Sequence, residues 1–378
     1  MRIVNLAQSN LCNIGTSLNR GLRANGHDAR SVVLQPAPYG MDVDLMWSRD
    51  EGACRQALEE AEVLHLSSLT PGFTVWLQRL PFSLPRLVRR RRLVVHYHGG
   101  DLRRQGHRSV KALIARHGVP AVVTVPDLLP YLPGSEWLPL PVDPADPRCA
   151  PANPPASPIR ICHAPTTRSV KKTDAFLAAM ERLRRKHDVE TVLIENRPYE
   201  EALAIKRTCH INFDNIGFGS YALASIESLL MEHPSLVYFN DACAGAVREH
   251  SEIVGIESPF VLVGDARQPT HEHLRAIVEG RAEAAHTEED IASIVRALES
   301  LVADDGMRRD LGRRGRRWAT AVHDERRVAR RAAEIYERAP RLDGFGLAER
   351  LLQVFWWGVA TAKNMVQRGR GSWLGRGA

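Results

Sequence analysis

Residues 209–239, CHINFDNIGFGSYALASIESLLMEHPSLVYF, decide which fold this sequence can adopt. Ile211 and Phe213 alternate with polar neighbours, which is typical of a half-buried strand, and Asp214-Asn215 predicts the turn that ends it. The Gly-Phe-Gly sequence at 217–219 then allows the backbone to bend closely. The stretch therefore predicts a buried strand that leads through a tight turn into a helix.

The predicted helix carries one carboxylate, Glu227. It is expected to begin near Ser220 or Tyr221 and to end before His233-Pro234, because proline cannot continue a helix. Apolar residues recur at helical spacing at positions 223, 226, 229 and 230, and Glu227 lies near that stripe. A buried carboxylate needs a partner, since an unpaired charge in the core costs several kcal/mol. A pair of ligand hydroxyls and a structural arginine both remain open as that partner.

Composition and length indicate a two-domain soluble protein. The chain has 378 residues, 44% of them hydrophobic and 25% charged, which suits two cores of ordinary size. Its six cysteines are scattered without a CxxC pair, which argues against a zinc site or a disulfide framework and predicts a cytoplasmic setting. The sequence shows neither a signal-peptide pattern nor an apolar run of about 18 residues.

The formal charge of +7 comes largely from runs of arginine. These runs occupy residues 86–92, 182–186, 308–317 and 326–331. We interpret them as solvated helix faces. No interleaved aromatic residues and no helix-turn-helix, zinc-finger or RNA-binding signature accompany them, so nucleic acid is not expected as a partner.

Strands and helices alternate through residues 1–143, which predicts a parallel, doubly wound α/β sheet. The expected strands are 2–7, 29–34, 62–66, 93–98 and 121–125, and the expected helices are 15–25, 50–60 and 109–117. Prolines then crowd the chain, and we place a linker at 144–158, because such a stretch can be neither regular helix nor central strand.

A second cycle of the same pattern follows the linker. Its expected elements are a strand at 159–163, a helix at 171–186, a strand at 190–195 and a helix at 199–207. We assign 159–322 to this second Rossmann-like domain, 323–344 to a closing helix and 345–378 to an amphipathic, basic tail. Two such domains facing each other leave a cleft between their strand ends, where ligands bind in open α/β sheets.

A basic loop opens the second domain. The sequence 160–174, RICHAPTTRSVKKTD, places cations where a helix is predicted to begin, an arrangement that suits a diphosphate. Arg168 together with Lys171 or Lys172 is a candidate pair for the two phosphates. The alternative is a basic loop that only happens to precede a helix.

These motifs together resemble the donor site of GT-B glycosyltransferases of the retaining family 4, or group 1, type. In that family an acidic strand end, a Gly-aromatic turn, a helix glutamate and a strand start near proline occur in the order found at 214–234, and "HAPTTR…KKTD" is similar to its H-x-P…K-G-x-D loop. The resemblance covers most of residues 1–340. It implies a GT-B fold and transfer of a sugar, with retention, from a UDP- or GDP-type nucleoside diphosphate sugar to a hydroxyl acceptor.

The resemblance also implies roles for individual residues. Glu227 would hold the ribose hydroxyls, and Arg168 with Lys172, which fits the family spacing better than its neighbour, would stabilise the leaving diphosphate. The other donor-binding candidates are Asp214, Gly219, Ser220, Tyr221, His163, Thr167, Lys171 and Gly15. Two features depart from the family pattern: Gly219 replaces a carboxylate eight residues before the glutamate, and Gly15 is all that remains of a Gly-Gly pair.

In the first domain, residues 96–103, HYHGGDLR, follow a predicted buried strand and resemble the family's H-G-x-D-x-R stretch. His98 and Asp101 are expected to face the cleft as catalytic candidates on the donor-sugar or acceptor side. A structural histidine is the alternative. No third ligand accompanies His96 and His98, and no DxD motif ends a strand, so we predict no zinc site, no metal requirement and no cofactor.

The tail combines an apolar stripe over 347–362 with Trp356 and Trp357, and cations without acids follow it. Such a stretch suits either an interfacial helix on an anionic membrane or a helix packed across the two domains. The expected partners are a nucleotide-sugar donor and a glycan or lipid-linked acceptor, with the inner membrane face as a further contact if the tail binds lipid. Two other functions stay open: a catalytically silent sugar-nucleotide or glycan-binding GT-B protein, and a non-hydrolysing UDP-sugar 2-epimerase.

Overall fold

The computed structural model describes residues 1–67, 87–99, 102, 117–264, 276 and 286–342. Predictions for the tail 345–378 and for Asp101 lie outside the described residues, as does nearly all of the helix expected at 109–117.

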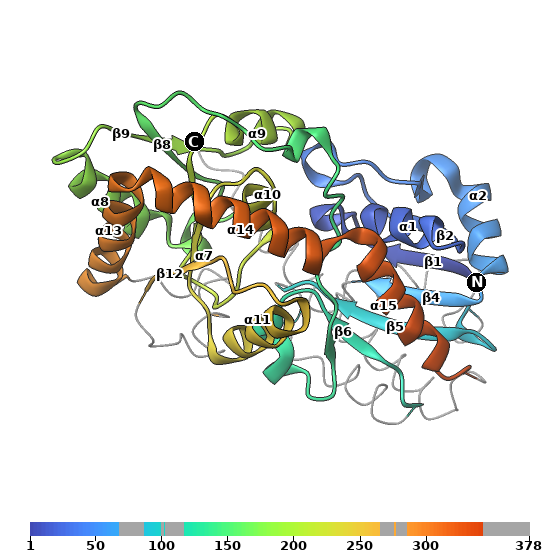
Figure 1. Ribbon diagram of the computed structural model, residues 1–378. Helices are drawn as coiled ribbons and strands as arrows, with labels where there is room; N and C mark the ends of the chain where they lie inside the picture. Colours follow the sequence, from blue (N-terminus) through green and yellow to red (C-terminus); the bar gives the residue numbers. More distant parts are fainter. Residues whose placement is uncertain (68–86, 100–101, 103–116, 265–275, 277–285, 343–378) are drawn as a thin grey trace, which may run out of the picture.

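The first lobe is built on a parallel sheet covered by helices (Figure 1). Among the described residues its strand order is β3-β2-β1-β4-β5-β6-β7. The strands are β1 Arg2–Ala7, β2 Asp28–Val33, β3 Leu45–Met46, β4 Val63–Ser67, β5 Arg92–Tyr97, β6 Ala121–Val123 and β7 Glu136–Trp137, and the helices between them are α1 Ile14–Ala24 and α2 Trp47–Glu60. All five residues of β4 are buried, as expected for a strand covered on both faces.

The second lobe repeats this architecture with the described strand order β12-β11-β10-β8-β9. Its strands are β8 Ile159–His163, β9 Val189–Leu193, β10 Ile211–Asn215, β11 Ser235–Val237 and β12 Val261–Leu262. Its helices are α7 Arg168–Lys171, α8 Thr173–Arg184, α9 Tyr199–Lys206, α10 Leu223–Leu230, α11 Asp241–Val254, α13 Glu288–Ala303 and α14 Asp305–His323. The predicted fold class, two doubly wound parallel sheets with flanking helices, is confirmed.

Two predicted helices differ from the observed ones. The single helix expected at 171–186 is broken at Lys172, whose left-handed backbone (φ 52°) separates α7 from α8. The helix after the glycine turn begins at Leu223 instead of Ser220 or Tyr221, because Asp214 accepts the backbone N–H of Ala222 and holds the preceding residues in an extended turn. Neither difference follows from local helix propensity: Lys172 is an unusual residue for a left-handed conformation, and the bond from Ala222 to Asp214 lies outside the helix.

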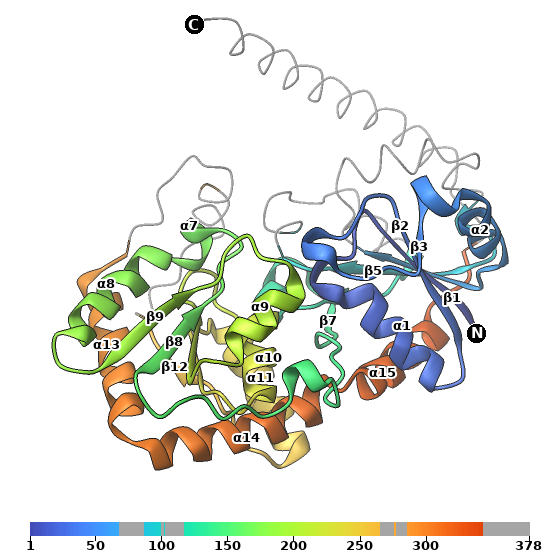
Figure 2. The same ribbon diagram turned by 90° about the horizontal axis from the view of Figure 1, so that it is seen from above.

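The chain crosses between the lobes twice, and the two crossings are bonded to each other. Val142 donates its backbone N–H to His323 O, and Glu325 donates to Val142 O, both at 2.8 Å. After this crossing, helix α15 (Glu325–Arg338) returns to the first lobe and lies beside α1 (Figure 2). The last described helix therefore completes the core of the first domain.

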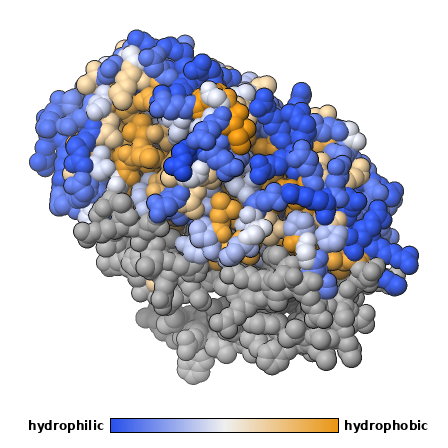
Figure 3. Space-filling model, turned by 60° about the horizontal axis from the view of Figure 1, so that its bottom comes forward, coloured by the Kyte–Doolittle hydropathy of each residue, from blue (hydrophilic) through white to orange (hydrophobic). Residues whose placement is uncertain are grey.

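Hydrophilic residues cover much of the face shown in Figure 3, with hydrophobic residues in separate patches between them. Helix α14 shows how the arginine runs are accommodated: Arg308 pairs with Asp305, Arg313 with Asp310 and Arg314 with Glu257.

Replacing Gly21 with alanine is expected to lower the free energy of unfolding by about 1–3 kcal/mol, because overpacking forces the backbones apart. A Cβ at this position would lie 2.1 Å from Glu325 O and 2.9 Å from the Ala329 Cβ. Gly52→Ala is the matched control, since a Cβ there meets nothing within 4 Å, and it is expected to stabilise α2 by up to about 1 kcal/mol. Equal effects of the two changes in urea denaturation would contradict this packing.

Candidate functional site

The carboxyl ends of the strands in the first lobe point toward the second lobe. The N-terminus lies at the outer edge of the first lobe, and β1 runs from there toward the other domain (Figure 1). Because β1, β4, β5 and β6 are parallel, the loops after them share this edge. Ligands bind at such edges in open α/β sheets.

Cys12, in the loop after β1, is affected by charged groups of the second domain. Cys12 is an exposed residue, although surrounding protein atoms desolvate its thiol. Desolvation and, to a smaller extent, the Glu227 carboxylate raise the pKa of the Cys12 thiol to about 11, whereas the Lys171 ammonium lowers it. The Cys12 thiol of the first domain therefore experiences two charges of the second domain, those of Glu227 and Lys171.

The loop that carries Cys12 is organised by Asn10, a residue that sequence reasoning missed. Asn10 is buried, and its amide donates to Asn13, Thr16 and the carbonyl of Asp42. Its carbonyl oxygen accepts the Gly15 N–H at 3.0 Å, so that backbone group, predicted to serve the donor, is already bonded within the loop. Cys12 and Asn13 adopt positive φ values of 52° and 55°, a conformation that glycine usually supplies.

Lys171 is the cation of the second lobe that affects the Cys12 thiol. It is nearly buried, pairs with Asp214 and lies 5.0 Å from the centre of the Phe218 ring. Asp214 also accepts hydrogen bonds from Ala222 N and Ser225 Oγ, and its pKa is lowered despite burial by the neighbouring Lys171 charge and these bonds. Asp214 therefore stays ionised and holds both Lys171 and the start of α10 in place.

Glu227 has two partners inside the protein. Lys206 Nζ lies 2.5 Å from Oε2, and the Tyr199 hydroxyl donates to Oε1 at 2.8 Å. Burial raises the pKa of Tyr199, which keeps this hydroxyl protonated as a donor. The partner that sequence reasoning left open, a ligand or an arginine, is thus a lysine from α9. Lys206 carried no local signal in the sequence, because its ion pair spans 21 residues.

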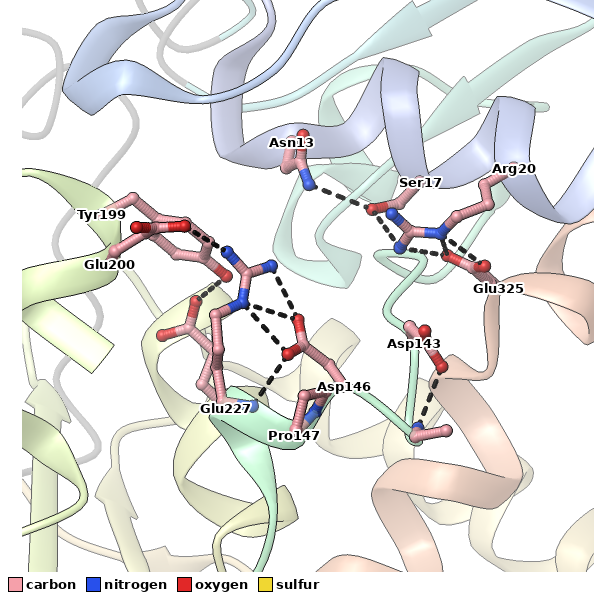
Figure 4. Close-up of polar contacts among 12 residues, drawn as sticks. Asn13, Ser17, Arg20, Asp143, Asp146, Pro147, Tyr199, Glu200, Glu227 and Glu325 are labelled. Carbon is pink, nitrogen blue, oxygen red and sulfur yellow. Dashed lines mark hydrogen bonds and ion pairs between the residues drawn. The ribbon is translucent and has the colours of Figure 1, made fainter. Parts of the chain in front are cut away.

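A second group of charges lies next to Glu227 at the junction of the lobes (Figure 4). Arg148 makes bonds of 2.8–3.2 Å to the Asp146 carboxylate, pairs with Glu200 and has its guanidinium 5.6 Å from the Tyr199 ring. Figure 4 shows Asn13, Ser17 and Arg20 of the first lobe across from Tyr199 and Glu200, with Asp143 and Asp146 on the connection between the lobes.

Arg168 and Lys172, the predicted catalytic pair, do not converge with Lys171. Arg168 is about half exposed and holds Glu195 through two bonds of 2.8 and 2.6 Å. Lys172 turns toward α13, where its ammonium lies 3.4 Å from Asp290. Thr167, predicted to contact the donor, is exposed at the N-cap of α7.

Three residues predicted to contact the donor have buried side chains. His163 Nδ1 donates to Phe213 O, and Nε2 accepts from Thr173 Oγ1. Burial lowers the pKa of His163 to about 4, so it is a neutral structural residue. Ser220 is fully buried, and the Tyr221 hydroxyl bonds to His323 inside an aromatic cluster. Their side chains therefore face the core.

The glycine turn is shaped by packing. A Cβ on Gly217 would lie 1.8 Å from Val170 O, so the turn packs directly against α7. Gly219 has φ +78°, and a Cβ there would lie 2.9 Å from the Asn240 Cβ. Since this position requires glycine, a carboxylate side chain cannot be accommodated there.

In the first lobe, His98 follows β5 and is half-buried. Its Nδ1 lies 2.6 Å from the Oγ1 of Thr124, a residue at the end of the adjacent strand β6.

Among the described residues no group of three or more His, Cys, Asp or Glu is arranged to hold a metal ion. No helix in the described part of the chain is long and apolar enough to cross a bilayer.

No protein-family model and no curated protein matches this sequence. Solved structures match it at low identity. A sucrose-phosphate synthase from Thermosynechococcus elongatus is 13% identical with a TM-score of 0.53, covering 89% of this chain and 99% of its own. An alpha-glucosyltransferase in complex with UDP and a 13-mer DNA is 10% identical, with a TM-score of 0.52 and the same coverage. A glycosyltransferase from Rickettsia africae is 11% identical, with a TM-score of 0.51, covering 89% and 97%.

These similarities extend over most of the chain and concern its fold. The protein has the GT-B arrangement, two Rossmann-like domains that face each other across a gap, and the neighbours that share it are glycosyltransferases. The predicted GT-B fold is confirmed.

Alkylation of Cys12 is expected to be slow at neutral pH. A thiol whose pKa is raised to about 11 holds about a hundredfold less thiolate at pH 7 than a free cysteine. The rate with iodoacetamide is therefore expected to rise about tenfold per pH unit toward pH 10, as the thiol deprotonates. The other cysteines are buried, so Cys12→Ser is the control and should abolish labelling. Rapid labelling at pH 7 would contradict the desolvated position.

Proposed function

We propose that this protein is a glycosyltransferase that moves a sugar from a UDP- or GDP-type nucleoside diphosphate sugar to a hydroxyl acceptor. The observation that carries the proposal is that Asp214 holds Lys171 beside the start of α10, the helix that carries Glu227, and that both groups affect the Cys12 thiol of the first domain. The gap thus brings together a cation suited to a diphosphate and a carboxylate suited to ribose hydroxyls. The alpha-glucosyltransferase that shares the fold was solved with UDP, which is consistent with a nucleotide donor.

In this mechanism, cleavage of the sugar–phosphate bond leaves negative charge on the diphosphate, and Lys171 stabilises that charge as it develops. Arg168 contributes when its exposed guanidinium exchanges Glu195 for the phosphate. Glu227 keeps lone pairs beyond those used by Lys206 and Tyr199, and these accept the ribose hydroxyls. Basic side chains take the place of a metal ion, and the sugar is transferred with retention.

The further aspects of the proposal concern partners and location. The acceptor is a glycan or a lipid-linked molecule, and the protein works in the cytoplasm. If the basic tail 345–378 binds anionic lipid, the enzyme sits at the inner membrane face.

A second function, a silent sugar-nucleotide binder, is favoured by one observation. Gly219 has φ +78° and a Cβ there would lie 2.9 Å from the Asn240 Cβ, so this turn offers no side-chain carboxylate to the donor sugar.

Thermal-shift measurements with UDP-glucose, UDP-N-acetylglucosamine and GDP-mannose, followed by assays of nucleoside diphosphate release in EDTA, test these functions. Stabilisation with release supports the transferase. Stabilisation without release, over a range of sugar acceptors, supports the binder. Conversion of UDP-N-acetylglucosamine to its C2 epimer would identify an epimerase, and no stabilisation by any of the three donors would refute the proposal.

A further inference from the structure

A chain of hydrogen bonds runs from α15 through the first sheet to His98. The Tyr336 hydroxyl lies 2.7 Å from His65 Nδ1, and His65 Nε2 lies 2.9 Å from His96 Nδ1. His96 Nε2 lies 2.8 Å from Thr124 Oγ1, which in turn lies 2.6 Å from His98 Nδ1. We call the first four residues, Tyr336, His65, His96 and Thr124, the buried relay.

Every member of the buried relay is inside the core, with at most 3% of its surface exposed. Burial lowers the pKa of His65 to about 3 and that of His96 well below its usual value, so both imidazoles are neutral. A neutral imidazole has one N–H donor and one acceptor nitrogen. Each histidine therefore accepts at one end and donates at the other.

The Tyr336 hydroxyl sets the direction of the relay. Burial raises the pKa of this hydroxyl, so it keeps its proton. His65 is its hydrogen-bond partner within the described part of the chain, and a buried O–H without an acceptor is strongly disfavoured. Tyr336 therefore donates to His65 Nδ1.

The remaining protons follow from this first donation. His65 donates from Nε2 to His96 Nδ1, and His96 donates from Nε2 to Thr124. The Thr124 hydroxyl then has its own proton left, and it donates to His98 Nδ1. The reverse order would leave the Tyr336 O–H unpaired in the core, which disfavours it by about tenfold or more.

We propose that the buried relay holds His98 in the tautomer that carries its proton on Nε2. In this form His98 donates a hydrogen bond from Nε2 to an oxygen of the bound substrate, a sugar hydroxyl or a phosphate oxygen, and does not serve as the base that removes a proton. The relay residues are positioning residues, because they act through His98. The substrate contact rests on the proposed function, whereas the tautomer is a property of the protein alone.

Long-range 1H–15N correlation spectra of protein labelled with 15N-histidine report the tautomer directly. The chain has 15 histidines, so the His98 signals are assigned by their loss in His98→Gln. We expect a single neutral form protonated on Nε2. A wild-type His98 protonated on Nδ1 would overturn the proposal.

Variants of the buried relay test whether it is the cause. Thr124→Val removes the hydroxyl and is expected to produce a mixture of His98 tautomers, whereas Thr124→Ser keeps the hydroxyl and the Nε2–H form. Tyr336→Phe removes the first donor, and with it the roughly tenfold bias, so a mixture is expected again. Tyr221→Phe removes another buried Tyr–His bond, to His323, and should leave the His98 tautomer unchanged.

The outcomes separate this proposal from the proposed function. The amide spectra of Thr124→Val and Tyr336→Phe show whether each variant is folded. If neither folded variant changes the His98 tautomer, the proposal for the relay is wrong even if sugar nucleotides bind. If the tautomer responds as expected but no sugar nucleotide stabilises the protein, the relay stands and the glycosyltransferase assignment fails.

Discussion

Replacing Lys206 with methionine is expected to lower the free energy of unfolding by about 3–5 kcal/mol, which is the usual cost of leaving one partner of a buried ion pair without its counter-charge. The Lys206 and Glu227 side chains are only 2% and 6% exposed. Lys206 also donates to Ala224 O at 3.2 Å, so the change removes two bonds at once. Methionine fills a similar volume and isolates the effect of the charge.

Urea denaturation measures this effect against two controls. The double variant Lys206→Met with Glu227→Gln removes both charges and is expected to recover most of the lost stability. Lys186→Met breaks an ion pair with Glu299 in which the lysine is 68% exposed, and it should cost less than about 1 kcal/mol. A Lys206→Met variant as stable as Lys186→Met would show that burial of the Glu227 carboxylate does not depend on its ion pair with Lys206.

Replacing Lys171 with methionine is expected to lower turnover by about 10²- to 10³-fold, the range found when a preorganised group that stabilises developing charge is removed. Steady-state kinetics with the donor identified by thermal shift measure this loss, which should fall on kcat more than on KM. Lys172→Met is the matched control. It removes the neighbouring cation, but that cation faces Asp290, so its effect should stay below about tenfold.

Lys171 is itself nearly buried against Asp214, so loss of turnover must be separated from loss of folding. Adding Asp214→Asn to Lys171→Met removes the orphaned carboxylate and is expected to restore stability without restoring turnover. Recovery of turnover in the double variant would mean that the lysine acts only through the fold. A larger loss of turnover in Lys172→Met than in Lys171→Met would favour Lys172 as the lysine that stabilises the diphosphate, as the family spacing implies.

The regular elements were largely readable from local patterns. The strand expected at 159–163 and the helix expected at 199–207 are observed as β8 and α9 within one residue. Alternation of apolar residues and the placement of proline determine such elements through contacts between near neighbours. The break at Lys172 was not predicted. A left-handed residue at a helix end is usually glycine or asparagine, and neither occurs at this position.

The site was predicted less completely, for a physical reason. Motif order named Asp214 and Glu227 as donor-binding candidates and preferred Lys172 to Lys171, and the structure shows what each of these residues contacts. Tyr221 and His163 belonged to the same motifs, yet packing turned their side chains inward. A motif specifies which residue types occur, but the direction of a side chain depends on what fills the space around it.

The order of residues alone determined that this chain builds two wound α/β layers with a proline-rich connection, because hydrophobic periodicity and turn residues act over a few positions. The tertiary structure alone decided which buried polar groups meet: Lys206 with Glu227 across 21 residues, and Tyr336 with His65 across 271. Burial removes these groups from water, so each must find a partner wherever the fold supplies one, however far away it lies in the chain.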